Sequence, residues 1–237
     1  MAMETSHECT KSVEVDATSV AIAGDSAGGN LAAAVALKLR DEKLEIQPTI
    51  QCLLYPVLQS IDLHSPSRLQ NSPMSGVLSG HGVMVSGYLG LPTKYAPIIH
   101  QNRHLSASLR QQYSKYLDYN QLPASFIPDG YEPTRAPPSS DPGQIPEAAQ
   151  KLFVQSYVAP LLSPDLSGLP QAYVFTVGAD TLRDDGALYV KRLQDAGVKA
   201  KLAHYPESFH GVLSVGIKFE ARDKGRREFV DFIKKNL

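Results

Sequence analysis

The sequence has too few cysteines for a disulfide framework or a cysteine-based metal site. Its 237 residues include only Cys9 and Cys52, which lack the spacing of a metal-ligand pair. The two thiols could pair with each other or remain free. No other pattern indicates a metal or an organic cofactor, so we expect neither.

The chain also lacks a strong charge of one sign and a long apolar run. Its formal net charge of −1 gives no electrostatic reason to expect a nucleic-acid partner. No segment approaches the roughly 18 consecutive apolar residues of a membrane span, and the polar residues 1–10 do not resemble a signal peptide. We therefore expect the chain as given to be soluble, without a signal or an anchor.

Length and composition favour an ordinary globular domain. The chain is 43% hydrophobic and 20% charged, and its 237 residues fit a single domain, 1–237, with a substantial core. Strands are expected at 18–23, 49–55, 171–177 and 199–205, and helices at 27–41, 184–197 and 221–236. Strands separated by helices imply βαβ units. The predicted fold class is α/β, with a mostly parallel sheet flanked by helices.

Residues 57–165 interrupt this alternation. The segment is rich in Pro, Ser, Tyr and Gln, and short helices are expected at 80–90, 105–119 and 147–154, with a loop at 137–143. We interpret it as a helical cap, or lid, over the carboxyl ends of the strands. A loose insertion is the alternative, but the Leu and Tyr content favours packed structure.

A Gly-x-Ser-x-Gly motif joins the first strand to the first helix. The residues are Gly24-Asp25-Ser26-Ala27-Gly28, and this context is typical of a nucleophile elbow. Gly24 and Gly28 are expected to leave room for the tight turn that lifts the Ser26 hydroxyl. The Ala27 N–H, at a helix N-terminus, would supply half of an oxyanion hole. An ordinary serine in a glycine-rich turn is the alternative.

A serine nucleophile needs a base and an acid that orients the base, and both follow in the order typical of this elbow. Asp180 comes at the end of the third strand, and His210 lies in the loop after the last strand. Asp180 and Asp184 could instead cap the following helix. His204 is a rival base, but its position within a strand disfavours it.

One further histidine pair has the spacing of a helical metal site. His100 and His104 are four residues apart, but Pro97 is close by and no Glu accompanies them. We therefore expect both rings to be solvated.

Taken together, these motifs resemble those of the hormone-sensitive-lipase-like branch of the α/β hydrolases. Residues 23–30 resemble its elbow, residues 178–186 its acid motif, usually Asp-Pro-Leu-Arg-Asp-Glu-Gly, and residues 209–211 its His-Gly motif. Residues 54–59 and 157–164 are also similar. Thr181 and Asp185 depart from the usual Pro and Glu. The combination resembles the arylacetamide deacetylase and neutral cholesterol ester hydrolase subfamily.

The resemblance implies a serine carboxylic-ester hydrolase for apolar acyl esters or arylacetamides. Ser26 would be the nucleophile, Asp180 the orienting acid and His210 the general base. It further implies a role in lipid metabolism and a location at the endoplasmic reticulum membrane or lumen. A non-catalytic binding protein on the same scaffold, like the plant gibberellin receptors, is an alternative, but those receptors have lost the base that His210 retains here.

The family's His-Gly-Gly-Gly oxyanion motif and its membrane anchor would lie before the elbow. At about 30 residues per βα unit, roughly 100 residues would precede the strands expected here. The sequence is therefore expected to be the C-terminal portion of such an enzyme, as a fragment, an isoform or an incomplete gene model. On its own it would be a poor catalyst or an inert product.

Overall fold

A computed structural model gives the arrangement of the chain and describes residue 16 and residues 18–71, 81–132, 145–216 and 219–237. The structural statements below concern these residues. Cys9 and the loop expected at 137–143 lie outside them. Cys52 is a buried free thiol.

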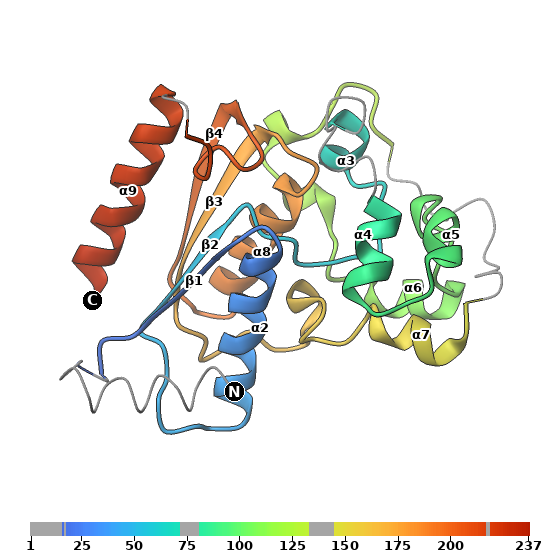
Figure 1. Ribbon diagram of the computed structural model, residues 1–237, viewed down its shortest axis with the longest axis horizontal. Coiled ribbons are helices and arrows are strands. Elements are labelled where there is room, and N and C mark those ends of the chain that lie inside the picture. Colours follow the sequence, from blue (N-terminus) through green and yellow to red (C-terminus); the bar gives the residue numbers. More distant parts are fainter. Residues whose placement is uncertain (1–15, 17, 72–80, 133–144, 217–218) are drawn as a thin grey trace.

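A four-stranded parallel sheet forms the centre of the fold (Figure 1). The strands are β1 (Ala21–Asp25), β2 (Ile50–Leu54), β3 (Gln171–Ala179) and β4 (Ala200–Phe209), and they pair in the order β1-β2-β3-β4. The central strands β2 and β3 are largely buried and mostly apolar, as strands covered on both faces require. All carboxyl ends therefore meet at one edge of the sheet. The predicted α/β class is confirmed, although β4 continues four residues beyond the expected strand.

Helices cover both faces of this sheet. The helices α2 (Ala27–Asp41) and α8 (Arg183–Asp195) lie on one face, and α9 (Glu220–Asn236) lies on the other (Figure 1). Alternate strand residues supply the two cores. Leu53 packs with the α2 and α8 side chains, whereas its neighbour Cys52 packs on the side of α9. The sheet thus lies between two packed layers of helices, which fix the edge where the strand carboxyl ends meet.

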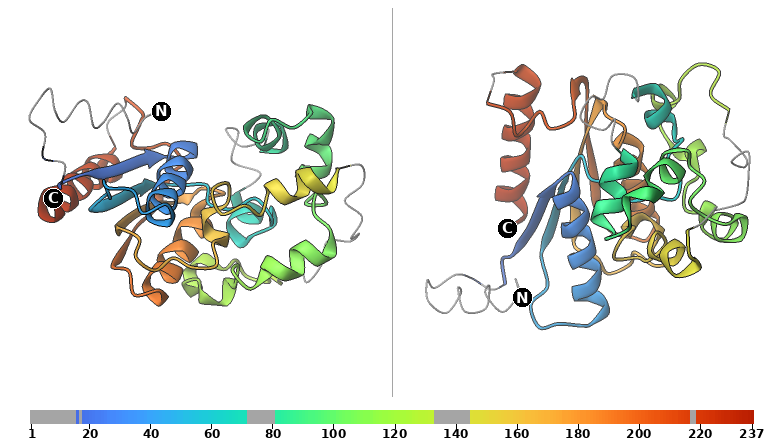
Figure 2. Two further views of the ribbon diagram at one scale, coloured as in Figure 1. Left: turned by 90° about the horizontal axis from the view of Figure 1, so that it is seen from below. Right: turned by 45° about the vertical axis from the view of Figure 1, so that its right-hand side comes forward.

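The segment between β2 and β3 contributes a group of short helices beside the sheet (Figure 2). They are α3 (Pro66–Asn71), α4 (His81–Tyr88), α5 (Ala96–His100), α6 (Ala107–Ser114) and α7 (Glu147–Leu152), with single 3-10 turns at Thr93–Tyr95, Tyr119–Gln121, Ala124–Phe126 and Pro160–Leu162. Three of them, α4, α6 and α7, fall within expected helices and are shorter. Buried residues such as Ile99 and Phe153 join the same core cluster as Leu53. This segment therefore packs with the α2 and α8 layer on that side of the sheet. In the described residues, no helix has the length and apolarity needed to cross a bilayer.

The expectation that His104 is solvated is wrong, whereas His100 is exposed. The His104 ring is 0% exposed and packs on the Phe153 ring, with centroids 4.6 Å apart. Its Nε2 lies 2.7 Å from the Ser60 carbonyl oxygen. Burial lowers the pKa of His104 to about 3, because an apolar environment disfavours the charged form. The ring is therefore a neutral core element, and the i, i+4 spacing carried no metal site.

Acid should weaken the contribution of His104 to folding. The unfolded chain takes up a proton at this residue below about pH 6.5, whereas the folded chain does so only near pH 3. The unfolded state binds more protons in that window, so the free energy of unfolding falls as the pH falls. Urea unfolding of wild type and His104→Gln should differ most above pH 6.5 and progressively less towards pH 4. His100→Gln is the matched control, and an equal pH-dependent difference for it would contradict this prediction.

Candidate active site

The residues of the Gly-x-Ser-x-Gly motif form a sharp turn between β1 and α2. Ser26 has φ 52° and ψ −117°, a conformation that non-glycine residues rarely adopt. Its N–H donates to the Leu54 carbonyl (2.8 Å), so β2 holds the turn from the neighbouring strand. Strained backbone of this kind persists when surrounding contacts enforce it. The turn therefore fixes Ser26 at the edge where the strand carboxyl ends meet.

The glycine requirement of this turn differs from the expected one. A Cβ on Gly24 would lie 2.1 Å from the Gly28 carbonyl oxygen, which no side chain tolerates. A Cβ on Gly28 would meet only the Asp25 carboxylate, at an ordinary 3.8 Å. Gly29 is the second crowded position, because its Cβ would lie 2.8 Å from the Pro56 Cβ. In this turn, therefore, a side chain does not fit at Gly24 and Gly29. The sequence had instead suggested Gly24 and Gly28.

Ser26 lies beside His210 and Asp180, which come from the ends of other strands. The His210 Nε2 lies 3.0 Å from the Ser26 Oγ, and its Nδ1 lies 3.0 Å from an Asp180 carboxylate oxygen. His210 directly follows β4, and its N–H donates to the Ala179 carbonyl (3.2 Å) at the end of β3. Asp180 is 1% exposed. The three side chains thus form one continuous polar chain at the sheet edge.

The Asp180 carboxylate and backbone are held from two directions. Its second oxygen accepts the Leu182 N–H (2.8 Å), and the Asn71 side-chain amide donates to the Asp180 and Gly178 carbonyls (3.1 and 3.2 Å). A Cβ on Gly178 would lie 1.9 Å from the Pro206 carbonyl oxygen. The close approach of these two backbones leaves the Asp180 loop little freedom.

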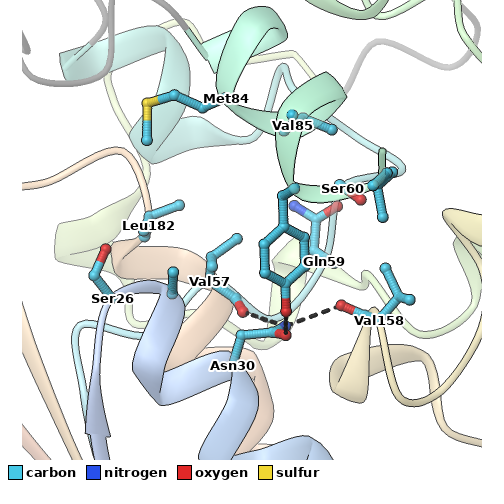
Figure 3. A pocket seen from close by; sticks show the side chains of 13 residues that line it. Ser26, Asn30, Val57, Gln59, Ser60, Met84, Val85, Val158 and Leu182 are labelled. Atoms are coloured by element: carbon cyan, nitrogen blue, oxygen red, sulfur yellow. Dashed lines mark hydrogen bonds between the residues drawn. The ribbon is translucent and has the colours of Figure 1, made fainter. Parts of the chain in front are cut away.

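A cavity of about 430 Å³ opens beside Ser26 (Figure 3). Its lining is mostly apolar and comprises Ser26, Ala27, Asn30, Val57, Gln59, Ser60, Met84, Val85, Gly87, Tyr88, Leu89, Val158 and Leu182. One buried amide connects its walls. Asn30 donates to the Val57 and Val158 carbonyls (2.8 and 2.9 Å) and accepts from the Tyr88 hydroxyl (2.7 Å). The elbow helix, the segment after β2 and α4 are therefore joined around the cavity.

Residues 2–114 and 145–214 match a family model described as the alpha/beta hydrolase fold. The chain belongs to this family. Mouse arylacetamide deacetylase is 35% identical and bovine neutral cholesterol ester hydrolase 1 is 32% identical, each over 94% of this chain and 56% of the relative. The structure of a bacterial heroin esterase superposes with a TM-score of 0.61 at 26% identity, covering 98% of this chain and 56% of that one. The chain therefore spans about half the length of the curated relatives it matches.

Within this α/β-hydrolase fold, the rival residues have other contacts. His204 lies in β4, where its Nδ1 is 3.0 Å from the Thr176 hydroxyl and its ring packs on Phe126. Burial lowers the pKa of His204 to about 4. Asp184 lies inside α8 and accepts the Ser67 N–H (2.6 Å). His204 is thus part of the packing around Thr176, and Asp184 is not the residue that caps α8.

Asp185, the last acidic residue of the motif at 178–186, is buried and links two segments of the chain. The Asp185 carboxylate accepts the Leu58 and Gln59 N–H groups (3.0 and 3.3 Å) and the Gln59 side-chain amide (3.0 Å). The Arg68 guanidinium lies 3.5 Å away. Burial raises the pKa of Asp185 to about 6. In this member of the hydrolase family, the start of the segment after β2 is thereby tied to the helix that follows Asp180.

Sequence reasoning missed Asn71, Asn30 and Tyr88. Asn71 ends α3, a six-residue helix without a clear periodic pattern, and its partners lie more than a hundred residues away. Asn30 did belong to the segment that resembles the family elbow, which was the available signal.

Among the described residues, no three His, Cys, Asp or Glu side chains gather as a metal site would require.

Proposed function

We propose that this protein is a serine hydrolase of carboxylic esters or arylacetamides with apolar acyl groups. Ser26 is the nucleophile, His210 the general base and Asp180 the acid that orients the base. One observation carries the proposal: the Ser26 hydroxyl is within hydrogen-bond distance of the His210 ring and also faces the apolar cavity. The similar proteins are by name a deacetylase, an ester hydrolase and an esterase, which supports hydrolase chemistry.

The order of the contacts favours proton transfer from serine to histidine. The Asp180 carboxylate beside Nδ1 favours the His210 tautomer with its proton on that nitrogen. The Nε2 lone pair is then free to accept the Ser26 proton. As that proton moves, the Ser26 Oγ attacks the substrate carbonyl carbon and the carbonyl π electrons move onto oxygen. The imidazolium that forms is stabilised by the buried carboxylate.

The tetrahedral intermediate then breaks down in a balanced sequence. Ala27 begins α2 and lines the cavity, so its backbone N–H is the proposed donor to the oxyanion. The oxyanion re-forms the carbonyl, the leaving alcohol or amine takes the proton from His210, and Ser26 is left acylated. Water, deprotonated by His210, attacks the acyl-enzyme by the same route. The products are a carboxylic acid and the free Ser26 hydroxyl.

The substrate class follows from the cavity lining. Val57, Val85, Val158 and Leu182 offer apolar surface, whereas few polar groups face the space. An apolar acyl group gains free energy by leaving water for such a site. We further propose that 57–165 acts as a cap within a single domain, since Val57, Val85 and Val158 all belong to it. The endoplasmic reticulum location remains a prediction from the resemblance.

Active-site labelling tests the proposal. In a version extended to the full length of its relatives, a fluorophosphonate, which reacts with activated serine hydroxyls, is expected to add once, and peptide mass spectrometry should locate the adduct at Ser26. Ser26→Ala should abolish the labelling, whereas Ser19→Ala, at a surface serine in the approach to β1, should not change it. Absence of labelling on correctly folded protein would favour the non-catalytic binding alternative and would reject the proposed mechanism.

A further inference from the structure

We propose that Tyr55 is a positioning residue that holds the imidazole of His210 by packing its ring against it. This inference rests on the proposed function. The two rings pack with centroids 4.8 Å apart and planes inclined by 55°. Tyr55 is 0% exposed, and the His210 side chain is 13% exposed. The tyrosine ring therefore shields much of one side of the proposed base.

The backbone of Tyr55 has an unusual conformation. Tyr55 directly follows β2 and has φ 38°, which is rare for a bulky side chain. Its N–H donates to the Phe175 carbonyl (2.7 Å), so the strand pairing continues through the strained residue. Pro56 comes next and fixes the direction of the chain. Strain of this kind, enforced by neighbouring contacts, is typical of functional sites.

A column of aromatic rings also packs against Tyr55. Its ring meets the edge of Phe175, with centroids 6.1 Å apart, and Phe175 stacks on Tyr205 at 4.9 Å. A Cβ on Gly225 would lie 2.7 Å from the Phe175 ring, so α9 closes the column without a gap. Rings packed at this density move little. The packing around Phe175 therefore restricts movement of the Tyr55 ring.

This support restrains a motion that the polar contacts of the imidazole leave open. The Asp180 carboxylate and the Ser26 hydroxyl act at the two ring nitrogens, on opposite sides of the imidazole. Contacts at these two atoms allow the ring to tilt about the line that joins them. The packed Tyr55 ring opposes that tilt and keeps the Nε2 lone pair directed at Ser26. A small misplacement of a reacting group can cost about 100-fold in rate.

The ring of Tyr55, rather than its hydroxyl, carries this role. Its hydroxyl lies 3.4 Å from the Ser214 Oγ and also meets the Leu213 backbone, so its polar partners belong to the turn after His210 and not to the imidazole. Tyr55→Phe should therefore keep kcat within about threefold of wild type, since it keeps the ring. Tyr55→Leu removes the ring and should lower kcat by about 10- to 100-fold with KM changed less than twofold, because the cavity is untouched.

Tyr173→Leu is the matched control for the loss of a buried tyrosine ring. Tyr173 is also 0% exposed and belongs to the same core cluster, but its ring packs on Phe229 and Phe232. This variant should lose thermal stability as Tyr55→Leu does while keeping kcat. An equal loss of kcat in both variants would show that general loosening of the core explains the effect and would overturn the proposal. So would wild-type kcat in Tyr55→Leu.

A second measurement separates this inference from the proposed function. The proton on the His210 Nδ1, beside the carboxylate, should give a low-field NMR signal in the substrate-free protein, identified by its loss in His210→Gln. We expect the signal to broaden in Tyr55→Leu and to stay sharp in Tyr55→Phe and Tyr173→Leu. If turnover does not depend on Ser26, the proposed function fails but this signal still reports ring order. A sharp signal in Tyr55→Leu overturns the positioning role. If Tyr55→Leu does not fold, Tyr55→Met, which also removes the ring, takes its place in both measurements.

Discussion

In a version extended to the full length of its relatives, Ser26→Ala should lower the turnover of an apolar ester by about 10⁶-fold, the typical cost of removing the nucleophile from a serine triad. The variant removes the hydroxyl that lies 3.0 Å from the His210 Nε2. The acyl-enzyme therefore cannot form at this position. The affinity for the substrate should change little, because the cavity lining is otherwise intact. Steady-state hydrolysis of a chromogenic ester, with wild type measured alongside, gives the ratio of rates.

Ser214→Ala is the matched control for this substitution. Ser214 is exposed in the turn after His210 and is close to the site, yet its hydroxyl takes no part in the proposed chemistry. It should retain wild-type turnover. A Ser26→Ala rate less than about 100-fold below wild type would mean that another residue supplies the nucleophile. Equal losses in the two variants would point to damage to the local structure instead.

The strands and long helices could be predicted because local signals agree with the tertiary structure there. The helix expected at 27–41 coincides with α2 (Ala27–Asp41), whose alanine-rich sequence both favours helix and allows close packing on the sheet. Phe229, Phe232 and Ile233 lie at helical spacing in the last helix, and all three pack against the core beneath α9. Such segments carry their periodicity in consecutive residues, so one sequence suffices to predict them.

The short helices and the supports of the candidate site could not be predicted in this way. The helix α5 (Ala96–His100) spans little more than one turn, too short for a periodic pattern. His104 is buried because segments distant in the sequence close over it, and nothing next to it reveals that. The same applies to Asn71, whose amide reaches the Asp180 carbonyl across more than a hundred residues. Long-range contacts decide these positions, and a local pattern does not contain them.

The candidate site shows the same division between motif and surroundings. The elbow and the order of Ser26, Asp180 and His210 along the chain could be predicted from the sequence, because the proposed chemistry needs those residue types at strand ends. The second crowded glycine could not, since only the position of Pro56 in space reveals that Gly29, rather than Gly28, lacks room for a Cβ. Tyr55 belonged to a segment that resembles the family, but its contact with the His210 ring is visible only in the assembled fold.

Asp180→Asn should lower kcat by about 10⁴-fold while KM stays near its wild-type value. The reason lies in the two contacts of the carboxylate. One oxygen accepts the Leu182 N–H (2.8 Å), so an asparagine would keep its carbonyl oxygen there and turn its NH₂ group towards the His210 Nδ1. That nitrogen would then have to accept, and the imidazole proton would move to Nε2. In this tautomer His210 cannot accept the Ser26 proton.

Asp129→Asn, at an exposed carboxylate, is the control for loss of one negative charge and should leave kcat unchanged. The double variant Ser26→Ala/Asp180→Asn gives the sharper test. Residues that act as one catalytic unit have non-additive effects, so the double variant should hydrolyse the ester no more slowly than Ser26→Ala alone. If the two losses instead multiply to about 10¹⁰-fold, or if Asp180→Asn costs less than about tenfold, Asp180 does not act through His210 and the proposed orienting role is wrong.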